Sequence, residues 1–225
     1  MAFLNLKPKE LEFGENTKAL CLSPHADDET IGMGGLLSKY PKNFDVVLLT
    51  DGRKGVKDMP ATEIIELREN EFRAAMQIAG VENYTFFRSK DKHLIEDLDT
   101  FKKLAISKYN CIFVPNIIDQ HPDHKAVSLL LNEILYTNPY RKDLKICFYE
   151  VWSTLGFVNA YLDISEFVDI KKAMISCYKS QNMSKDYVYH AIGLNQYRGM
   201  FKDKKFTEAF CVMDVEEFKK VCELY

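Results

Sequence analysis

Two short polar segments of this sequence hold the side chains best suited to chemistry. The first is Ser-Pro-His-Ala-Asp-Asp-Glu at residues 23–29, and the second is Asp-Gln-His-Pro-Asp-His at residues 119–124. Together they contain three of the five histidines in the chain. Imidazole and carboxylate groups are good zinc ligands, and a catalytic zinc usually keeps three protein ligands and one open position for water. The two segments therefore predict a zinc site divided between distant parts of the sequence.

The spacing within each segment suggests which side chains could take part. His25 and Asp28 stand three residues apart across a tight turn, so both could bind a metal from one loop while a histidine of the second segment completes the set. Water bound to zinc has its pKa lowered toward ~7 and attacks best when a carboxylate takes its proton. Asp27 is the candidate base. His121 is the candidate acid or oxyanion donor, and Asp123 could hold one of the imidazoles in orientation.

Each segment also has an ordinary structural interpretation. Acidic residues after a strand often cap a helix, so Asp27 to Thr30 could simply charge the first turn of the helix that follows. The second segment could be a solvated turn that opens on Pro122. Both segments together, each after a strand of one α/β domain, favour the metal site.

The elements that would bring the segments together follow from the alternation of apolar patterns along the chain. Runs typical of strands alternate with stretches of helical periodicity at least ~10 residues long. The expected strands are residues 18–24, 44–50, 84–89, 111–116 and 145–152, with additions at 160–165 and 206–214, and the expected helices are 29–40, 62–80, 97–109 and 124–136. This alternation predicts an α/β fold with right-handed βαβ units and a mostly parallel sheet covered on both faces. Ligands bind such sheets beyond the carboxyl ends of the strands.

Composition narrows the class of protein. The 30 Lys and Arg against 33 Asp and Glu give a net charge of -3 without a basic block, so we expect no nucleic-acid partner and no anionic-membrane anchor. We expect no membrane span, because no apolar run approaches ~18 residues, and the lack of a leader pattern predicts a cytoplasmic protein. Six cysteines without a Cys-x-x-Cys pair indicate reduced, mainly core thiols. With no linker or repeat, residues 1–225 are expected to form one domain.

The same motifs give the sequence a resemblance to a known family. With Pro-His-Ala-Asp-Asp-Glu at residues 24–29 and His-Pro-Asp-His at residues 121–124, it resembles the PIG-L/LmbE-like family of zinc-dependent de-N-acetylases. Weaker matches extend over most of the chain, at residues 48–55, 67–81, 171–181 and 206–210. The resemblance implies a Rossmann-like three-layer α/β/α sandwich, with the whole chain as a single LmbE-like deacetylase domain.

The resemblance also implies a role for individual residues. Zn²⁺ would be held by three of them: His25, Asp28 and His124. Three further ionisable side chains of the motifs would act on the reaction: Asp27 as general base, His121 as acid or oxyanion stabiliser, and Asp123 as the neighbour that sets the charge of His121.

Three further positions bear on the substrate. Arg68, in the Arg-x-x-Glu stretch, corresponds to an arginine that in relatives reaches the substrate, and the alternative is an ion pair with Glu71 three residues on. His190 and Arg198 could line a sugar pocket, with a surface or capping role as the alternative. Ala26 stands where the family usually has proline, which frees the backbone at that turn and removes no ligand.

The activity implied by the resemblance is a zinc-dependent hydrolase that removes an N-acetyl (N-acyl) group from a small-molecule amino sugar or its glycoconjugate. Homo-oligomer formation stays open. A nucleotide-binding Rossmann-like protein is a second interpretation, but Gly-Met-Gly-Gly at residues 32–35 does not fit the G-x-G-x-x-G pattern. A non-catalytic carbohydrate-binding protein is a third, and a broken ligand set would favour it.

Overall fold

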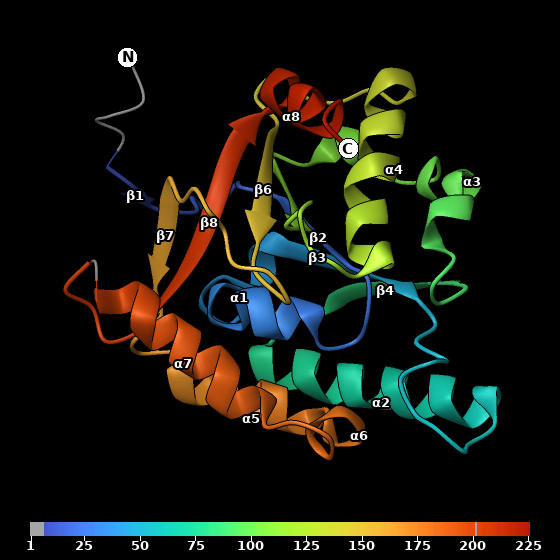
Figure 1. Cartoon of the computed structure of the whole chain (residues 1–225). Coiled ribbons are helices and arrows are strands. Elements are labelled where there is room, and N and C mark those ends of the chain that lie inside the picture. Colours follow the sequence, from blue (N-terminus) through green and yellow to red (C-terminus); the bar gives the residue numbers. More distant parts are fainter. Residues whose placement is uncertain (1–6, 201) are drawn as a thin grey trace.

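The computed structural model describes residues 7–200 and 202–225, and its strands form one eight-stranded sheet (Figure 1). The first six residues lie outside the described residues, and they are part of the N-terminal stretch on which the expected cytoplasmic location rests. The order of neighbouring strands is β1-β7-β8-β6-β5-β2-β3-β4. The strands are β1 (Lys9–Glu10), β2 (Ala19–Ser23), β3 (Phe44–Thr50), β4 (Asn83–Ser89), β5 (Cys111–Pro115), β6 (Lys145–Tyr149), β7 (Ala160–Asp163) and β8 (Thr207–Asp214).

The direction of the strands confirms the mostly parallel sheet. Among the described strands, every pairing is parallel except those that β8 makes with β6 and β7. The central pair β2 and β5 places Ala19 beside Cys111 and Cys21 beside Phe113. Because the two strands run in the same direction, the loops that follow them leave the sheet at the same edge.

Helices cover the two faces of this sheet (Figure 1). They are α1 (Asp28–Lys39), α2 (Ala61–Ala79), α3 (Leu98–Phe101), α4 (Pro122–Thr137), α5 (Val168–Cys177), α6 (Lys179–Asn182), α7 (Tyr187–Met200) and α8 (Val215–Cys222). Side chains alternate along β2, so that Leu20 and Leu22 join the core under α4 and α8, whereas Ala19 and Cys21 join the core under α1 and α2. Two cores on opposite faces confirm the predicted three-layer α/β/α sandwich. Among the described residues, no helix combines the length and the apolar character needed to cross a membrane.

The long helix predicted over residues 62–80 is confirmed by α2. Gly80 follows its last residue with φ 77°, and its backbone N–H donates to the carbonyl groups of Met76 and Gln77. A left-handed residue at this position closes the last turn, and glycine adopts it without a steric penalty.

The helix predicted over residues 97–109 is wrong. The structure has only the single turn α3 and a short 3-10 turn at Ile106–Lys108. The side-chain amide of Asn138, just after α4, donates to the carbonyl groups of Lys102 and Leu104 at 3.0 and 3.2 Å. A distant side chain therefore satisfies carbonyl groups that a continuous helix would have bonded internally. The strand predicted over residues 145–152 is also too long, because β6 ends at Tyr149.

A buried ion pair supports the middle of α1. The helix is interrupted at Met33, whose φ of -146° is not helical, so the next amide groups lack partners within the first half of the helix. The Glu208 carboxylate accepts hydrogen bonds from the N–H groups of Gly35 and Leu36, both at 2.8 Å. Lys171 Nζ lies 2.7 Å from Glu208 Oε1, and both side chains are fully buried. The lysine balances a charge that would otherwise be costly to bury.

Candidate metal centre and active site

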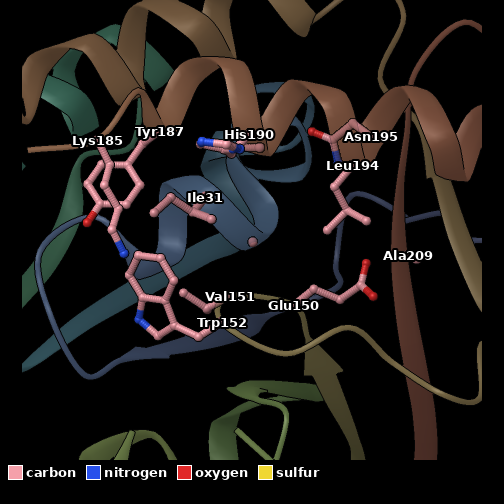
Figure 2. Close-up of a pocket in the computed structure, with 12 residues that line it drawn as sticks. Ile31, Glu150, Val151, Trp152, Lys185, Tyr187, His190, Leu194, Asn195 and Ala209 are labelled. Atoms are coloured by element: carbon pink, nitrogen blue, oxygen red, sulfur yellow. The ribbon is translucent and has the colours of Figure 1, made fainter. Parts of the chain in front are cut away.

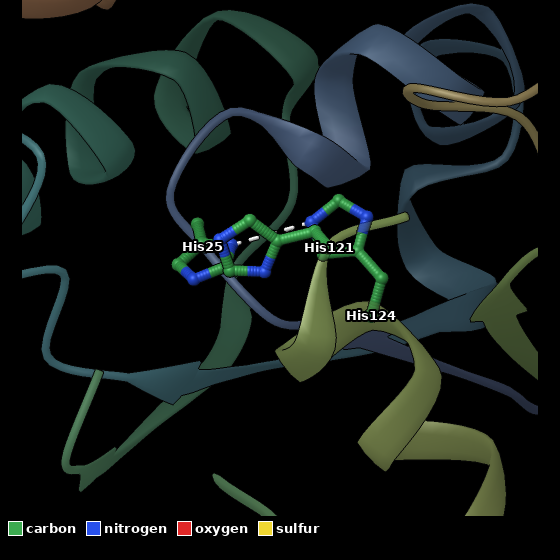
Figure 3. A group of neighbouring side chains, drawn as sticks. All are labelled: His25, His121 and His124. Atoms are coloured by element: carbon green, nitrogen blue, oxygen red, sulfur yellow. Dashed lines mark hydrogen bonds between the residues drawn. The ribbon is translucent and has the colours of Figure 1, made fainter. Parts of the chain in front are cut away.

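The two polar segments meet at the carboxyl end of the sheet. His25 lies in the loop between β2 and α1, and His121 and His124 lie at the start of α4, in the chain that follows β5. Figure 3 shows the three rings converging from these two loops, although 99 positions separate His25 from His124. The neighbouring parallel strands thus bring together side chains that are far apart in the sequence.

The side chains of His25, Asp28 and His124 form a compact group of possible ligand atoms. Asp28 Oδ2 lies 3.1 Å from His25 Nδ1 and 3.1 Å from His124 Nε2, and these two nitrogens are 3.3 Å apart. Ligand atoms about 2.0–2.1 Å from a tetrahedral zinc stand roughly 3.3 Å from one another. The group therefore has the size of one face of a tetrahedral zinc site, and the predicted ligands are the residues that form it.

Carboxylates lie behind the far nitrogen of His25. Its Nε2 is 3.2 Å from Asp123 Oδ2 and 3.4 Å from Asp91 Oδ1. The Asp123 carboxylate accepts hydrogen bonds from the N–H groups of Lys92 and Leu94, which hold it in place. A proton on Nε2 that faces these carboxylates leaves the lone pair of Nδ1 for a metal. Asp123 thus contacts His25, whereas the resemblance implied a neighbour of His121.

His124 has a similar arrangement. Its Nδ1 lies 3.3 Å from Asp119 Oδ2, and both side chains are fully buried. Asp119 also accepts hydrogen bonds from the N–H groups of His121 and Trp152. Sequence reasoning did not single out Asp119 or Asp91 as site residues. The position of Asp119 at the start of the second motif segment could have indicated it as a site residue. No sequence pattern around Asp91 indicates such a role.

The electrostatics of the site favour a positive charge between the two rings. Burial opposes the charged form of His124, but Asp28 and Asp119 raise its pKa to about 9. Burial likewise opposes the charged form of His25, yet its contacts with Asp123, Asp28 and Asp91 raise its pKa well above the usual value. A bound cation replaces such protons. Imidazole and carboxylate donors with carboxylates behind them are the chemistry that zinc prefers, so these residues fit the ion.

Asp27 lies next to the ligand group in an unusual backbone conformation. Its φ of 138° and ψ of -30° lie in a sparsely populated region, and its carbonyl begins α1 by accepting from Thr30 and Ile31. Its Oδ2 lies 3.4 Å from Arg68 Nη2. Burial raises the pKa of Asp27 to about 7, although Arg68 opposes the shift.

Arg68 extends from α2 toward Asp27 and the ligand group. It is buried, and its Nε and Nη1 have no hydrogen-bond partner among the described residues. The expected alternative, an ion pair with Glu71, is not formed: Glu71 instead accepts from Ser180 N and Ser180 Oγ, both at 2.7 Å. The guanidinium therefore has N–H groups left for a ligand.

His121 is the first residue before α4 and caps that helix. Its Nδ1 accepts the backbone N–H of Asp123 at 3.2 Å, which places the ring proton on Nε2. Burial, together with His25 and His124, lowers the pKa of His121. One of its nitrogens lies within 4.8 Å of nitrogens of both other rings, so it borders the metal position. A neutral ring with an Nε2–H group is suited to donate a hydrogen bond there.

Glu29, the last acid of the first motif, supports the loop from behind. It is fully buried and accepts from the hydroxyl groups of Ser23 and Thr30 at 2.9 and 2.7 Å and from Tyr178. Gln181, three residues after Tyr178, donates from its Nε2 to the Gly55 carbonyl at 3.0 Å. Tyr178 and Gln181, which belong to the weak match at residues 171–181, thus contact the first motif and the loop after β3.

The catalytic cavity enclosed by these groups has a volume of about 140 Å³. The motif residues His25, Asp27, Asp28, Arg68 and His121 line it together with Asp91, and so do four residues to which the sequence analysis gave no role: Lys54, Lys92, Trp152 and Gln181. These four residues lie in loops and in α6, and the tertiary fold determines how far each lies from the metal position.

Other residues named from the sequence lie elsewhere. Gly32 belongs to α1, where an added Cβ would stand 2.3 Å from the Tyr149 ring, so the glycine-rich stretch packs against β6 and does not form a phosphate-binding loop. His190 is exposed on α7. Arg198 forms an ion pair with the buried Glu150, which differs from the expected surface or capping role. All six cysteines are free thiols.

Comparisons with known proteins bear on the family and the fold of this chain. A model of the PIG-L family, described as GlcNAc-PI de-N-acetylase, matches residues 20–135. Diacetylchitobiose deacetylase of Thermococcus kodakarensis is 28% identical over 192 residues, which cover 75% of this chain and 72% of that protein.

Solved structures share the fold. N,N'-diacetylchitobiose deacetylase from Pyrococcus horikoshii superposes with a TM-score of 0.78 at 23% identity, over 89% of this chain and 85% of that one. GalB, the 4-carboxy-2-hydroxymuconate hydratase from Pseudomonas putida KT2440, has a TM-score of 0.67 at 18% identity, over 88% and 96% of the two chains. The family match includes both motif segments and more than half of the sequence, and this chain therefore belongs to the PIG-L family of de-N-acetylases.

Proposed function

We propose that this protein is a zinc-dependent hydrolase that removes an N-acetyl group from an amino sugar or its glycoconjugate. The observation that carries the proposal is the group of Asp28 Oδ2, His25 Nδ1 and His124 Nε2, with atoms 3.1–3.3 Å apart and a carboxylate behind each ring. The named activities of the relatives, deacetylases of N-acetylated sugars, support the substrate class.

The residues around this group have complementary tasks. Zinc held by His25, Asp28 and His124 would act as a Lewis acid toward the amide carbonyl and its attacking water. Asp27 takes a proton from the attacking water as the new C–O bond forms. His121 Nε2–H donates to the oxyanion that develops on the carbonyl oxygen. Asp27 then gives the proton that it took from the water to the amine nitrogen as the C–N bond breaks, and acetate and the free amino sugar leave.

Arg68 and Asp123 position other groups of the site: Arg68 the substrate, and Asp123 the His25 ring. The unpaired Nε and Nη1 of Arg68 bind hydroxyl groups of the sugar and hold the acetamido group beside Asp27. Asp123 orients the His25 ring through its contact with Nε2. A hydratase on the same fold shows that the fold alone does not decide the reaction, so these side chains carry the proposal.

The proposal extends to the number of domains and to the cellular compartment of the protein. We propose that residues 1–225 form one domain, since the described strands belong to one sheet. We also propose a cytoplasmic location, which six free thiols support, because reduced cysteines are typical of reducing compartments.

The test is a metal analysis combined with an assay of acetate release. Purified protein is expected to contain about one zinc per chain and to release acetate from N-acetylated amino sugars. A chelator should abolish the release, and added zinc should restore it. Protein that binds no zinc after reconstitution would contradict the proposal, and zinc-loaded protein inactive on a panel of N-acetylated sugars, sugar nucleotides and glycosides would favour a binding function.

A further inference from the structure

The chain at residues 178–181, which joins α5 to α6, contacts three elements that border the catalytic cavity. We name it the Tyr178 segment, and Figure 1 shows the two helices that it joins beside α2. Its side chains donate hydrogen bonds to Glu29 in the first motif, to Glu71 on α2 and to the Gly55 carbonyl in the loop after β3. None of these three residues is a proposed metal ligand. The segment therefore contacts the other parts of the site.

Tyr178 is connected to the backbone of the proposed base through one carboxylate. Its hydroxyl donates to Glu29 Oε1, and both side chains are fully buried. The other oxygen of that carboxylate, Glu29 Oε2, accepts the backbone N–H of Asp27 at 3.3 Å. Two hydrogen bonds thus link the tyrosine hydroxyl to the residue that takes the proton from the attacking water.

The backbone conformation of Asp27 depends on such contacts. Its φ of 138° and ψ of -30° belong to a sparsely populated region, which persists only where the surrounding structure holds it. On one side α1 does so, because Thr30 and Ile31 donate to the Asp27 carbonyl at 3.0 and 2.8 Å. On the other side the N–H of Asp27 donates to Glu29. The direction of the Asp27 side chain therefore depends on where the Glu29 carboxylate is held.

Ser180 holds an acid that would otherwise compete for Arg68. Glu71 stands one turn after Arg68 on α2, at a spacing that suits an ion pair. Burial opposes the charge of Arg68, but Asp27 and then Glu71 raise its pKa. Glu71 Oε1 nevertheless accepts from Ser180 N and Glu71 Oε2 from Ser180 Oγ, both at 2.7 Å. Because each of its two oxygens has this other partner, the acid does not pair with the arginine.

Arg68 keeps free donors as a result. Its Nη2 lies 3.4 Å from Asp27 Oδ2, whereas its Nε and Nη1 have no hydrogen-bond partner among the described residues. Buried donors without a partner are unfavourable, and hydroxyl groups of a bound sugar would satisfy them. A carboxylate of Glu71 turned toward the guanidinium would take these donors away from the sugar.

We propose that the Tyr178 segment positions the Asp27–Arg68 pair. Tyr178 holds the carboxylate of Glu29 and, through it, the backbone of Asp27. Ser180 holds the carboxylate that neighbours Arg68 on α2, so the arginine keeps its free N–H groups for the substrate. The inference rests on the proposed function and deepens it, since it assigns positioning residues to the base and to the arginine that binds the sugar.

The first variant tests the contact with the base. The substrate is the member of the panel of N-acetylated sugars, sugar nucleotides and glycosides that the wild type hydrolyses best. Tyr178→Phe removes only a hydroxyl group and should lower kcat about tenfold with KM within about twofold, because the base is less well placed in the transition state. The zinc content should stay at the wild-type level. Glu29→Gln repeats this test if thermal unfolding shows that Tyr178→Phe does not fold.

Tyr109→Phe is the matched control for this variant. Tyr109 is also a buried tyrosine whose hydroxyl donates to a carboxylate, that of Asp45 at 2.7 Å, but this pair lies at the amino ends of the strands. The control loses a comparable hydrogen bond and should keep the wild-type kcat.

The second variant should have the opposite kinetic effect. Ser180→Ala frees Glu71 Oε2 to accept from Arg68, so KM should rise about three- to tenfold while kcat stays within about twofold. Glu71→Gln added to Ser180→Ala should return KM close to the wild-type value, because a neutral amide competes weakly for the guanidinium. Ser176→Ala, which removes a hydroxyl group that donates to a carbonyl within α5, is the matched control and should keep KM.

Each other outcome has a definite meaning. An unchanged kcat in Tyr178→Phe or an unchanged KM in Ser180→Ala overturns the positioning role. Loss of zinc from either variant also overturns it, because the segment would then act on the metal ligands. A raised KM that persists after Glu71→Gln is added contradicts the task assigned to Ser180. If the wild type releases acetate from no member of the panel, the proposed function itself is contradicted.

Discussion

The catalytic cavity shares the Trp152 side chain with a second space, the Trp152 hollow, but the two differ in their linings (Figure 2). Beside the cavity, atoms of His25, Asp28 and His124 lie within 3.3 Å of one another, and a further carboxylate contacts each of the two rings. The hollow has aliphatic and aromatic side chains such as Ile31 and Leu194 together with the charged Glu150 and Lys185. The difference shows that the compact ligand group lies at the ends of neighbouring parallel strands, whereas the lining of the hollow comes mainly from α1, α7 and the loop after β6.

Loss of a metal ligand should have the largest effect. In His124→Ala the remaining donors cannot complete the group, so the zinc content should fall from about one per chain to near zero and acetate release should fall to background. Metal analysis after dialysis and an acetate assay measure both. His93→Ala, which changes an exposed histidine outside the site, serves as the control. Full zinc occupancy in His124→Ala would show that the ligand set is wrong.

Removal of the base should separate chemistry from metal binding. Asp27→Asn should lower kcat by about 10²–10⁴, because the attacking water loses its proton acceptor, while the zinc content stays the same. Steady-state kinetics with parallel metal analysis are the measurement, and Asp99→Asn on the exposed surface is the control. A kcat close to that of the wild type would remove Asp27 from the mechanism.

The carboxylates behind the ligands should have a smaller effect. Asp119→Asn should weaken zinc binding by about 10–100-fold, because the Asp119 carboxylate 3.3 Å from His124 Nδ1 favours the proton there and leaves Nε2 for the metal. Competition with a chelator of known affinity measures the change, and activity should return at high zinc concentration. Unaltered zinc affinity would show that the His124 ring is held by packing alone.

Local patterns in the sequence predicted much of the fold. Strand β3 spans the predicted residues 44–50, and Gly80 ends α2 as expected, because side-chain periodicity and glycine conformation are properties of the local chain. The helix predicted over residues 97–109 failed because the distant Asn138 bonds its carbonyl groups. Local periodicity contains no information about such a partner.

The sequence by itself determined the family resemblance, most of the order of strands and helices along the chain, and the two motif segments, since short-range spacing specifies them. Only the tertiary structure decided that Asp91 stands beside His25 and that Arg68 is buried beside Asp27 without Glu71 as its partner. It also placed the Trp152 hollow next to the catalytic cavity. These features depend on which loops meet at one edge of the sheet, and that is set by strand order and long-range packing, which no local pattern encodes.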